Sequence, residues 1–140
     1  MPNISNNFFF LQCPDEHFYA VQIFPTEEKL QQEIKKIRGR ACKQDKEVRA
    51  LCLRYVAQKR DSLGEFETTK ELGSIFFLEQ DRYSIEVVVH ELSHAAVGWA
   101  NRIGLQPVAQ ARSKKPSDEE RFAVCMQSLT RQYFQKCKQS

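Results

Sequence analysis

The stretch SIEVVVHELSHAAVGWAN, residues 84–101, determines how we expect this chain to fold. Apolar side chains stand on both sides of its polar centre, His90-Glu91-Leu92-Ser93-His94. An apolar segment of this length is typical of a largely buried helix. Gly104 and Pro107 follow it, and both residue types commonly end helices. We therefore predict one buried α-helix over residues 84–101.

Two histidines four positions apart, with a glutamate after the first, form the HExxH pattern of zinc hydrolases. His90 and His94 share one helix face and can bind one metal ion, while Glu91 points at a metal-bound water. Zinc lowers the pKa of that water toward ~7, and the glutamate takes its proton as the water attacks a carbonyl. The alternative is two core histidines bonded to backbone carbonyls, with Glu91 in an ion pair. We favour the metal, because burial makes unpaired imidazoles and a carboxylate costly.

A catalytic zinc ion needs a third protein ligand and one open position for water. The remaining histidine, His17, lies far upstream, and Val97 and Ala100 occupy the positions that the three-histidine metzincin pattern reserves for Gly and His. Acidic residues instead open a second amphipathic segment, which is expected to be a helix. The acids are Asp118, Glu119 and Glu120, and the apolar stripe is Phe122, Cys125, Met126, Leu129 and Tyr133. Each acid also suits a helix N-terminus, where it would only complement the helix dipole.

Three stretches of the chain resemble the gluzincin metallopeptidases, above all the minimal cytosolic ones of the ImmA/IrrE type and phage-borne HExxH proteins. They are IFFL at residues 75–78, HELSHAAVGWANRIG at 90–104 and ERFA at 120–123, and the likeness covers roughly residues 65–136. Many members of that family carry an acidic residue where this chain has Val124. The resemblance implies an α+β fold of zincin type, with a small mixed or antiparallel sheet packed against the HExxH helix and a C-terminal helix.

The resemblance also implies which residues form the site. In that family the ligand glutamate is commonly followed, three positions later, by a small residue. Glu120 with Ala123 fits this pattern, whereas Glu119 is followed by Phe122. Helical periodicity alone favours Glu119, which stays as the alternative. The implied site has Zn²⁺ as cofactor, Glu91 as general base, and three ligands: His90, His94 and Glu120.

What such a protein acts on follows from the same likeness. We expect a protein or peptide substrate, with a transcriptional repressor as one candidate, and a phage or mobile-element context. In that family an edge strand beside the motif helix pairs with extended substrate, and residues 74–79 fit this place. The alternative is a central core strand, which is the more common place for four apolar residues in a row. The candidates for stabilising the oxyanion are Tyr83, Tyr133, His17 and Arg121. The rival hypothesis is a catalytically inactive regulatory or interaction protein on the same scaffold, with a structural metal or a nucleic-acid-associated role.

Composition predicts a single cytoplasmic domain over residues 1–140. The 5 cysteines form no CxxC pair, and no signal peptide or membrane-spanning apolar stretch is found, as expected for the reducing cytosol. Cys52 and Cys125 stand in apolar runs and are expected to be small buried residues. The densest basic run lies between residues 35 and 49, and we interpret it as a solvated helix and loop. We therefore expect no direct nucleic-acid ligand and no membrane contact. Nothing in the sequence indicates an oligomeric state.

The rest of the chain alternates strands and helices. Residues 7–11, 18–24 and 72–79 are expected to be strands, and residues 64–68 a turn with a short strand. A helix over residues 26–37 would begin at the capping residue Thr26 and carry Leu30, Ile34 and Ile37 on one face. The segment from residue 48 to 60 fits either state, and we favour a helix. This order predicts an α+β fold.

Overall fold

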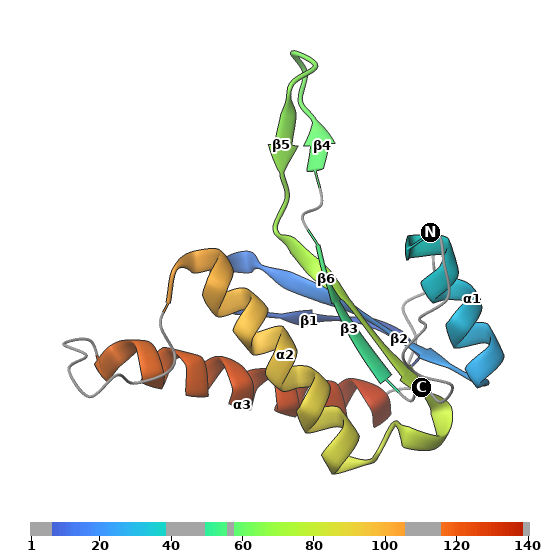
Figure 1. The fold of residues 1–140 in the computed structure, drawn as a ribbon. Coiled ribbons are helices and arrows are strands. Elements are labelled where there is room, and N and C mark those ends of the chain that lie inside the picture. Colours follow the sequence, from blue (N-terminus) through green and yellow to red (C-terminus); the bar gives the residue numbers. More distant parts are fainter. Residues whose placement is uncertain (1–6, 39–49, 56–57, 106–115, 139–140) are drawn as a thin grey trace.

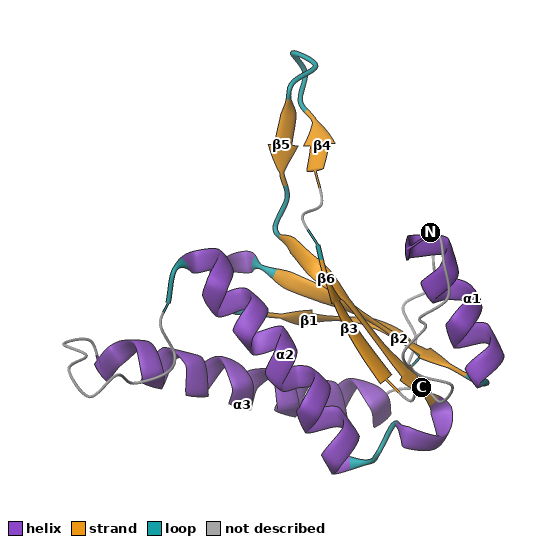
Figure 2. Ribbon diagram, in the orientation of Figure 1, coloured by secondary structure: helices purple, strands orange, loops and turns teal. Residues whose placement is uncertain are grey.

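The computed structural model describes residues 7–38, 50–55, 58–105 and 116–138. Its described elements confirm the α+β class (Figures 1 and 2). The strands are β1 (Phe8–Gln12), β2 (Phe18–Phe24), β3 (Ala50–Arg54), β4 (Gln58–Arg60), β5 (Phe66–Thr68) and β6 (Glu71–Leu78). The helices are α1 (Glu27–Arg38), α2 (Ile85–Ile103) and α3 (Pro116–Lys138), with short 3-10 turns η1 (Pro14–Glu16) and η2 (Glu79–Asp81).

Four strands form one mixed sheet in the order β1-β2-β6-β3. β6 runs parallel to β2 and antiparallel to β3, and it is therefore a central strand. Ile75 and Phe77 join the core on one side of the sheet, while Phe76 and Leu78 join the core on the other. Of the two alternatives for residues 74–79, the central core strand is confirmed and the edge strand is wrong, because alternate side chains of this apolar run are buried on both faces. The edge strand nearest α2 is β3.

Helices cover the two faces of this sheet. α2 and α3 pack on one face, and α1 lies on the other (Figure 1). The Thr26 hydroxyl accepts a hydrogen bond from the Lys29 amide at 3.2 Å, which confirms the predicted cap of α1. Leu30 and Ile34 of α1 are fully buried, but Ile37 is 46% exposed and does not belong to the buried face.

The predicted helix over residues 48–60 is wrong. Ala50–Arg54 is a strand paired with β6, and Gln58–Arg60 pairs with β5 in a hairpin that projects away from the body of the protein (Figure 1). Pairing with β6 gives the short segment a hydrogen-bonded partner that a sequence pattern does not reveal. Gly64 turns the hairpin with φ +82°, which confirms the predicted turn before a short strand. Residues 48, 49, 56 and 57 lie outside the described part.

The boundaries of α2 agree with the sequence. The Ser84 hydroxyl accepts a hydrogen bond from the Val87 amide at 3.4 Å, and Gly104 ends the helix with φ +78° in the left-handed conformation. Pro107, the second predicted stop signal, lies outside the described residues, as does the basic run beyond residue 38. Within the described ranges, no helix combines the length and the apolar content that crossing a membrane requires.

The four described cysteines are free thiols. Cys125 is fully buried in the core, as the sequence predicts. Cys52, by contrast, is only half-buried, because it lies on the edge strand β3 beside α2.

Candidate metal centre

Only one face of α2 is buried. That face consists of Val88, Leu92, Ala95, Ala96, Trp99 and Ala100, each 0% exposed. His90 and His94 lie on the outer side of the helix, and the His90 side chain is 69% exposed. The expectation of a largely buried helix is therefore wrong for the histidines. Because both imidazoles are exposed, burial does not require them to have a protein or metal partner. Whether they suit a metal depends on their geometry.

The two imidazoles, here called the histidine pair, converge. The Nε2 atoms of His90 and His94 are 3.3 Å apart, and the ring planes meet nearly edge to face. A tetrahedral zinc ion with bonds of about 2.05 Å holds two ligand nitrogens about 3.3 Å apart. The pair thus has the spacing that one zinc ion needs, and both donor atoms are the kind that zinc prefers.

The surroundings of His94 favour its neutral form. Partial burial lowers the pKa of His94, and the positive charges that His90 and Arg54 can carry lower it further. A neutral imidazole offers the lone pair that metal binding requires. His94 is therefore disposed toward ligation rather than protonation.

Glu91 lies at the boundary between the buried face of α2 and the sheet. It is 6% exposed, and its Oε1 lies 3.9 Å from Nε2 of His90. Burial raises the pKa of Glu91, while His90 and a hydrogen bond with the backbone of Cys52 partly offset this shift. The other carboxylate oxygen, Oε2, has no hydrogen-bond partner in the described structure. The carboxylate of Glu91 is thus anchored by the backbone of Cys52, and its buried Oε2 lacks a hydrogen-bond partner among the described residues.

The register of β3 explains the anchor. Tyr55 donates its amide to the carbonyl of Leu72, so every second residue counted back from Tyr55 bonds to β6. Cys52 lies between the residues that bond to β6, so its amide points to the free edge of the sheet. Because α2 lies against this edge, the carboxylate of Glu91 can cap that amide.

His90, Glu91 and His94 form one group whose ligand atoms all lie within 4.8 Å of one another. Among the described residues, no His, Cys, Asp or Glu from another element joins them. The structure thus brings together three of the four predicted site residues.

α3 runs antiparallel to α2. The Tyr133 hydroxyl donates to the carbonyl of Arg82, which joins the end of α3 to the start of α2. At the other end, Arg121 lies 3.9 Å from Asp15 in η1, and the Trp99 indole donates to a carbonyl in the same turn. The first turns of α3 are therefore level with the last turns of α2.

This arrangement separates Glu120 from the histidine pair. Glu120 and its alternative Glu119 are exposed on the first turns of α3, level with Trp99 rather than with His90 and His94. Neither carboxylate belongs to the histidine group. This arrangement does not support the prediction that α3 supplies the third ligand, and it stays a prediction.

Three of the four predicted oxyanion donors have other partners, and the fourth, His17, is buried. The hydroxyl of Tyr83 donates to the carbonyl of Cys137, and that of Tyr133 donates to Arg82. His17 is buried beside η1, and Arg121 faces Asp15.

The cation close to the histidine pair is Arg54, whose charge lowers the pKa of His94. Sequence reasoning missed this residue because the segment was assigned to a helix. The alternation of Val48, Ala50 and Cys52 was the available signal for a strand.

Comparison of the chain with protein-family models, with curated proteins and with solved structures finds no match.

Proposed function

We propose that this protein is a zinc-dependent hydrolase of peptide bonds with a zincin-like fold. The observation that carries the proposal is the spacing of 3.3 Å between the Nε2 atoms of His90 and His94, with the buried Glu91 directly beside them. Two nitrogen donors at this separation suit one zinc ion, and a carboxylate next to them suits a general base.

Each residue of the group has a distinct role in this proposal. His90 and His94 hold the ion through Nε2. When bound, zinc acts as a Lewis acid that lowers the pKa of water and polarises the scissile carbonyl. Glu91, whose Oε1 lies 3.9 Å from Nε2 of His90, takes a proton from the attacking water and delivers it to the nitrogen of the leaving amine. A hydrogen bond with the backbone of Cys52 holds the carboxylate in place.

The exposure of the site favours catalysis over a purely structural metal. Structural zinc sites are closed by four protein ligands, whereas catalytic sites keep one position open. The histidine pair lies on the outer side of α2, where a peptide can approach. We extend the proposal to an intracellular protein or peptide substrate, and a transcriptional repressor is the candidate that the family resemblance suggests.

A second candidate function rests on the missing third ligand. Among the described residues, only the histidine pair and Glu91 form the group, and Glu120 is level with the far end of α2. A site of this kind can bind metal without turning over substrate. The second candidate is therefore a catalytically inactive regulatory protein on the same scaffold.

Replacement of Glu91 by glutamine tests the first candidate. The zinc-loaded protein is incubated with a mixed peptide library, and new termini are identified by mass spectrometry. We expect cleavage by the unaltered protein and a loss of at least about 100-fold in Glu91→Gln, with zinc content retained. Glu86→Gln, an equal change on an exposed carboxylate in the first turn of α2, is the control.

Undiminished cleavage by Glu91→Gln would exclude the general-base role. A protein that binds zinc but cleaves no peptide would favour the second candidate.

A further inference from the structure

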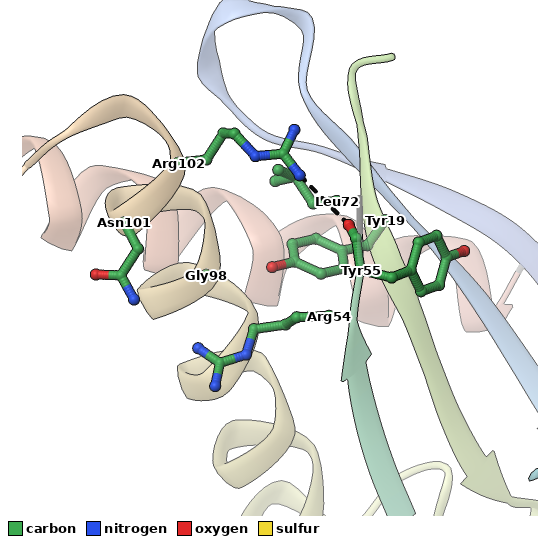
Figure 3. Close-up of a pocket in the computed structure, with 7 residues that line it drawn as sticks. All are labelled: Tyr19, Arg54, Tyr55, Leu72, Gly98, Asn101 and Arg102. Atoms are coloured by element: carbon green, nitrogen blue, oxygen red, sulfur yellow. Dashed lines mark hydrogen bonds between the residues drawn. The ribbon is translucent and has the colours of Figure 1, made fainter. Parts of the chain in front are cut away.

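α2 and the edge of the sheet enclose an open hollow of about 570 Å³ (Figure 3). Tyr19 and Leu72 form its floor, and Arg54 of β3 reaches across it toward α2. The ring of Tyr55 points away from α2, so the hollow is open between the helix and the strand.

The hollow lies beside the histidine pair along α2. Gly98, one of its lining residues, follows His94 by one helical turn, about 6 Å along the axis. Asn101, another lining residue, lies two turns after His94 and on the same side of the helix. Arg54 lines the hollow and also acts electrostatically on His94. The candidate metal centre and the hollow are therefore neighbours along one face of α2.

Gly98 brings the strand and the helix close together at this point. A Cβ atom on Gly98 would lie 2.6 Å from Cδ of Arg54, and it would also meet the hydroxyl of Tyr19. Tyr19 cannot yield easily, because its hydroxyl donates to the carbonyl of Ala95 at 2.8 Å. The absence of a side chain at Gly98 thus lets Arg54 lie directly against α2.

The charge of the hollow is positive. Two guanidinium groups line it, from Arg54 and Arg102, and no Asp or Glu does so among the described residues. Arg102 is held by the carbonyls of Tyr55 at 3.3 Å and Thr69 at 3.5 Å. For Arg54, the described residues supply no carboxylate partner within ion-pair distance. A planar guanidinium without a carboxylate partner among the described residues suits the carboxylate of a ligand, to which it can bond through two nitrogens.

We infer that this hollow is a substrate pocket in which Arg54 and Arg102 bind a carboxylate of the peptide. The position of this pocket relative to the scissile bond rests on the proposed function. An extended chain advances about 3.3 Å per residue, so a carboxylate in the hollow lies two or three residues from a carbonyl held at the histidine pair. The carboxylate can belong to an acidic side chain or to the C-terminus of the substrate.

Binding to the metal-free protein tests the pocket without any cleavage. Three probes differ in whether they carry one carboxylate and where it lies. They are N-acetyl-Ala-Ala-Glu-Ala-Ala-amide, its neutral Gln counterpart as the amide, and the Gln counterpart with a free C-terminal carboxylate. Calorimetry should show at least one of the two charged peptides binding about tenfold more tightly than the neutral amide. Tighter binding of the first assigns the pocket to a side chain, and tighter binding of the third assigns it to a C-terminus.

Arg54→Gln should remove most of that difference, while Arg60→Gln, an equal charge change on the projecting β4, should keep it. Thermal unfolding of both variants checks that Arg54→Gln remains folded. Equal affinities for all three peptides, or an undiminished difference in Arg54→Gln, would overturn the inference.

The peptide library separates the inference from the proposed function. Cleavage by the zinc-loaded protein with no preference for a carboxylate two or three residues from the cut overturns the pocket and leaves the hydrolase intact. No cleavage, combined with tighter binding of a charged probe, supports the pocket as a carboxylate site and overturns the hydrolase.

Discussion

The inner and outer sides of α2 belong to one helix, but their side chains serve different purposes. On the inner side, Val88, Leu92 and Trp99 are excluded from solvent and pack in the core. On the outer side, His90 and His94 are exposed, although their nitrogens converge to 3.3 Å. Folding explains the inner side, because burial of apolar area stabilises it. It does not explain two converging imidazoles on the outside, and such groups indicate binding.

From this difference between the two sides of α2 we predict how substitutions on each side act. Changes on the inner side should lower the free energy of unfolding and affect ligand binding only through loss of the folded state. Changes on the outer side should alter binding while the free energy of unfolding stays nearly constant. The variants below test that separation.

The largest effect on stability is expected for Trp99→Ala. The indole is fully buried and donates a hydrogen bond to the carbonyl of Pro14 at 3.2 Å. Its removal should lower the free energy of unfolding by about 3–5 kcal/mol. Chemical denaturation measures this, with Val89→Ala on the more exposed side expected to change it by no more than about 0.5 kcal/mol. Equal effects of the two changes would break the division of α2 into two sides.

Gly98→Ala sharpens the comparison, because Gly98 lies where the outer side of α2 meets the sheet. At an open helical position, alanine would stabilise by up to about 1 kcal/mol. Here the added Cβ would meet Arg54 and the fixed hydroxyl of Tyr19, so we expect a net loss of about 1–2 kcal/mol. Urea denaturation measures the difference, and a more stable variant would show that the close approach at Gly98 is unimportant.

A smaller effect is expected at His17, a buried single histidine that contrasts with the exposed pair. Burial lowers the pKa of His17, and the nearby charge of Lys70 lowers it further. The unfolded chain takes up a proton at this residue near pH 6.5, whereas the folded chain does so only at a lower pH. Stability is therefore lost as the pH falls below about 6.5, by at most about 1.4 kcal/mol per pH unit from this group.

His17→Gln should flatten that part of the profile. Unfolding curves recorded between pH 7.5 and 5, a range around the ordinary histidine pKa of about 6.5, compare the variant with the unaltered protein. A variant as pH-sensitive as the unaltered protein would contradict the assignment to His17.

Local signals were enough to predict much of this fold. Thr26 caps α1 and Gly104 ends α2 where the sequence predicts, and both signals are features of a few neighbouring residues. The motif likewise predicts the histidine pair, because four residues of helix bring the two rings together. The chemistry of that group, by contrast, remains a proposal.

The errors concern relations between distant segments. β3 was assigned to a helix because its strand character depends on pairing with β6, about twenty residues later in the sequence. That error also hid Arg54. The role of Glu120 stays a prediction, because its level along α2 depends on the direction in which α3 crosses α2, and neither helix encodes that direction in its own residues. The small side chain of Ala123 predicted that α3 approaches α2 closely, but it did not specify the position along α2 at which the two helices meet.

Zinc titration decides whether the histidine pair is a metal site. Metal-free protein is titrated with zinc against a competing chelator, and the same titration is run on His94→Ala and on Glu120→Gln. We expect one zinc ion per chain, an affinity at least about 100-fold lower in His94→Ala, and an unchanged free energy of unfolding for that variant. Glu120→Gln should bind zinc like the unaltered protein, because its carboxylate lies outside the histidine group. A folded protein that binds no zinc, or a His94→Ala variant that binds it equally well, would show that the histidine pair is not a zinc site.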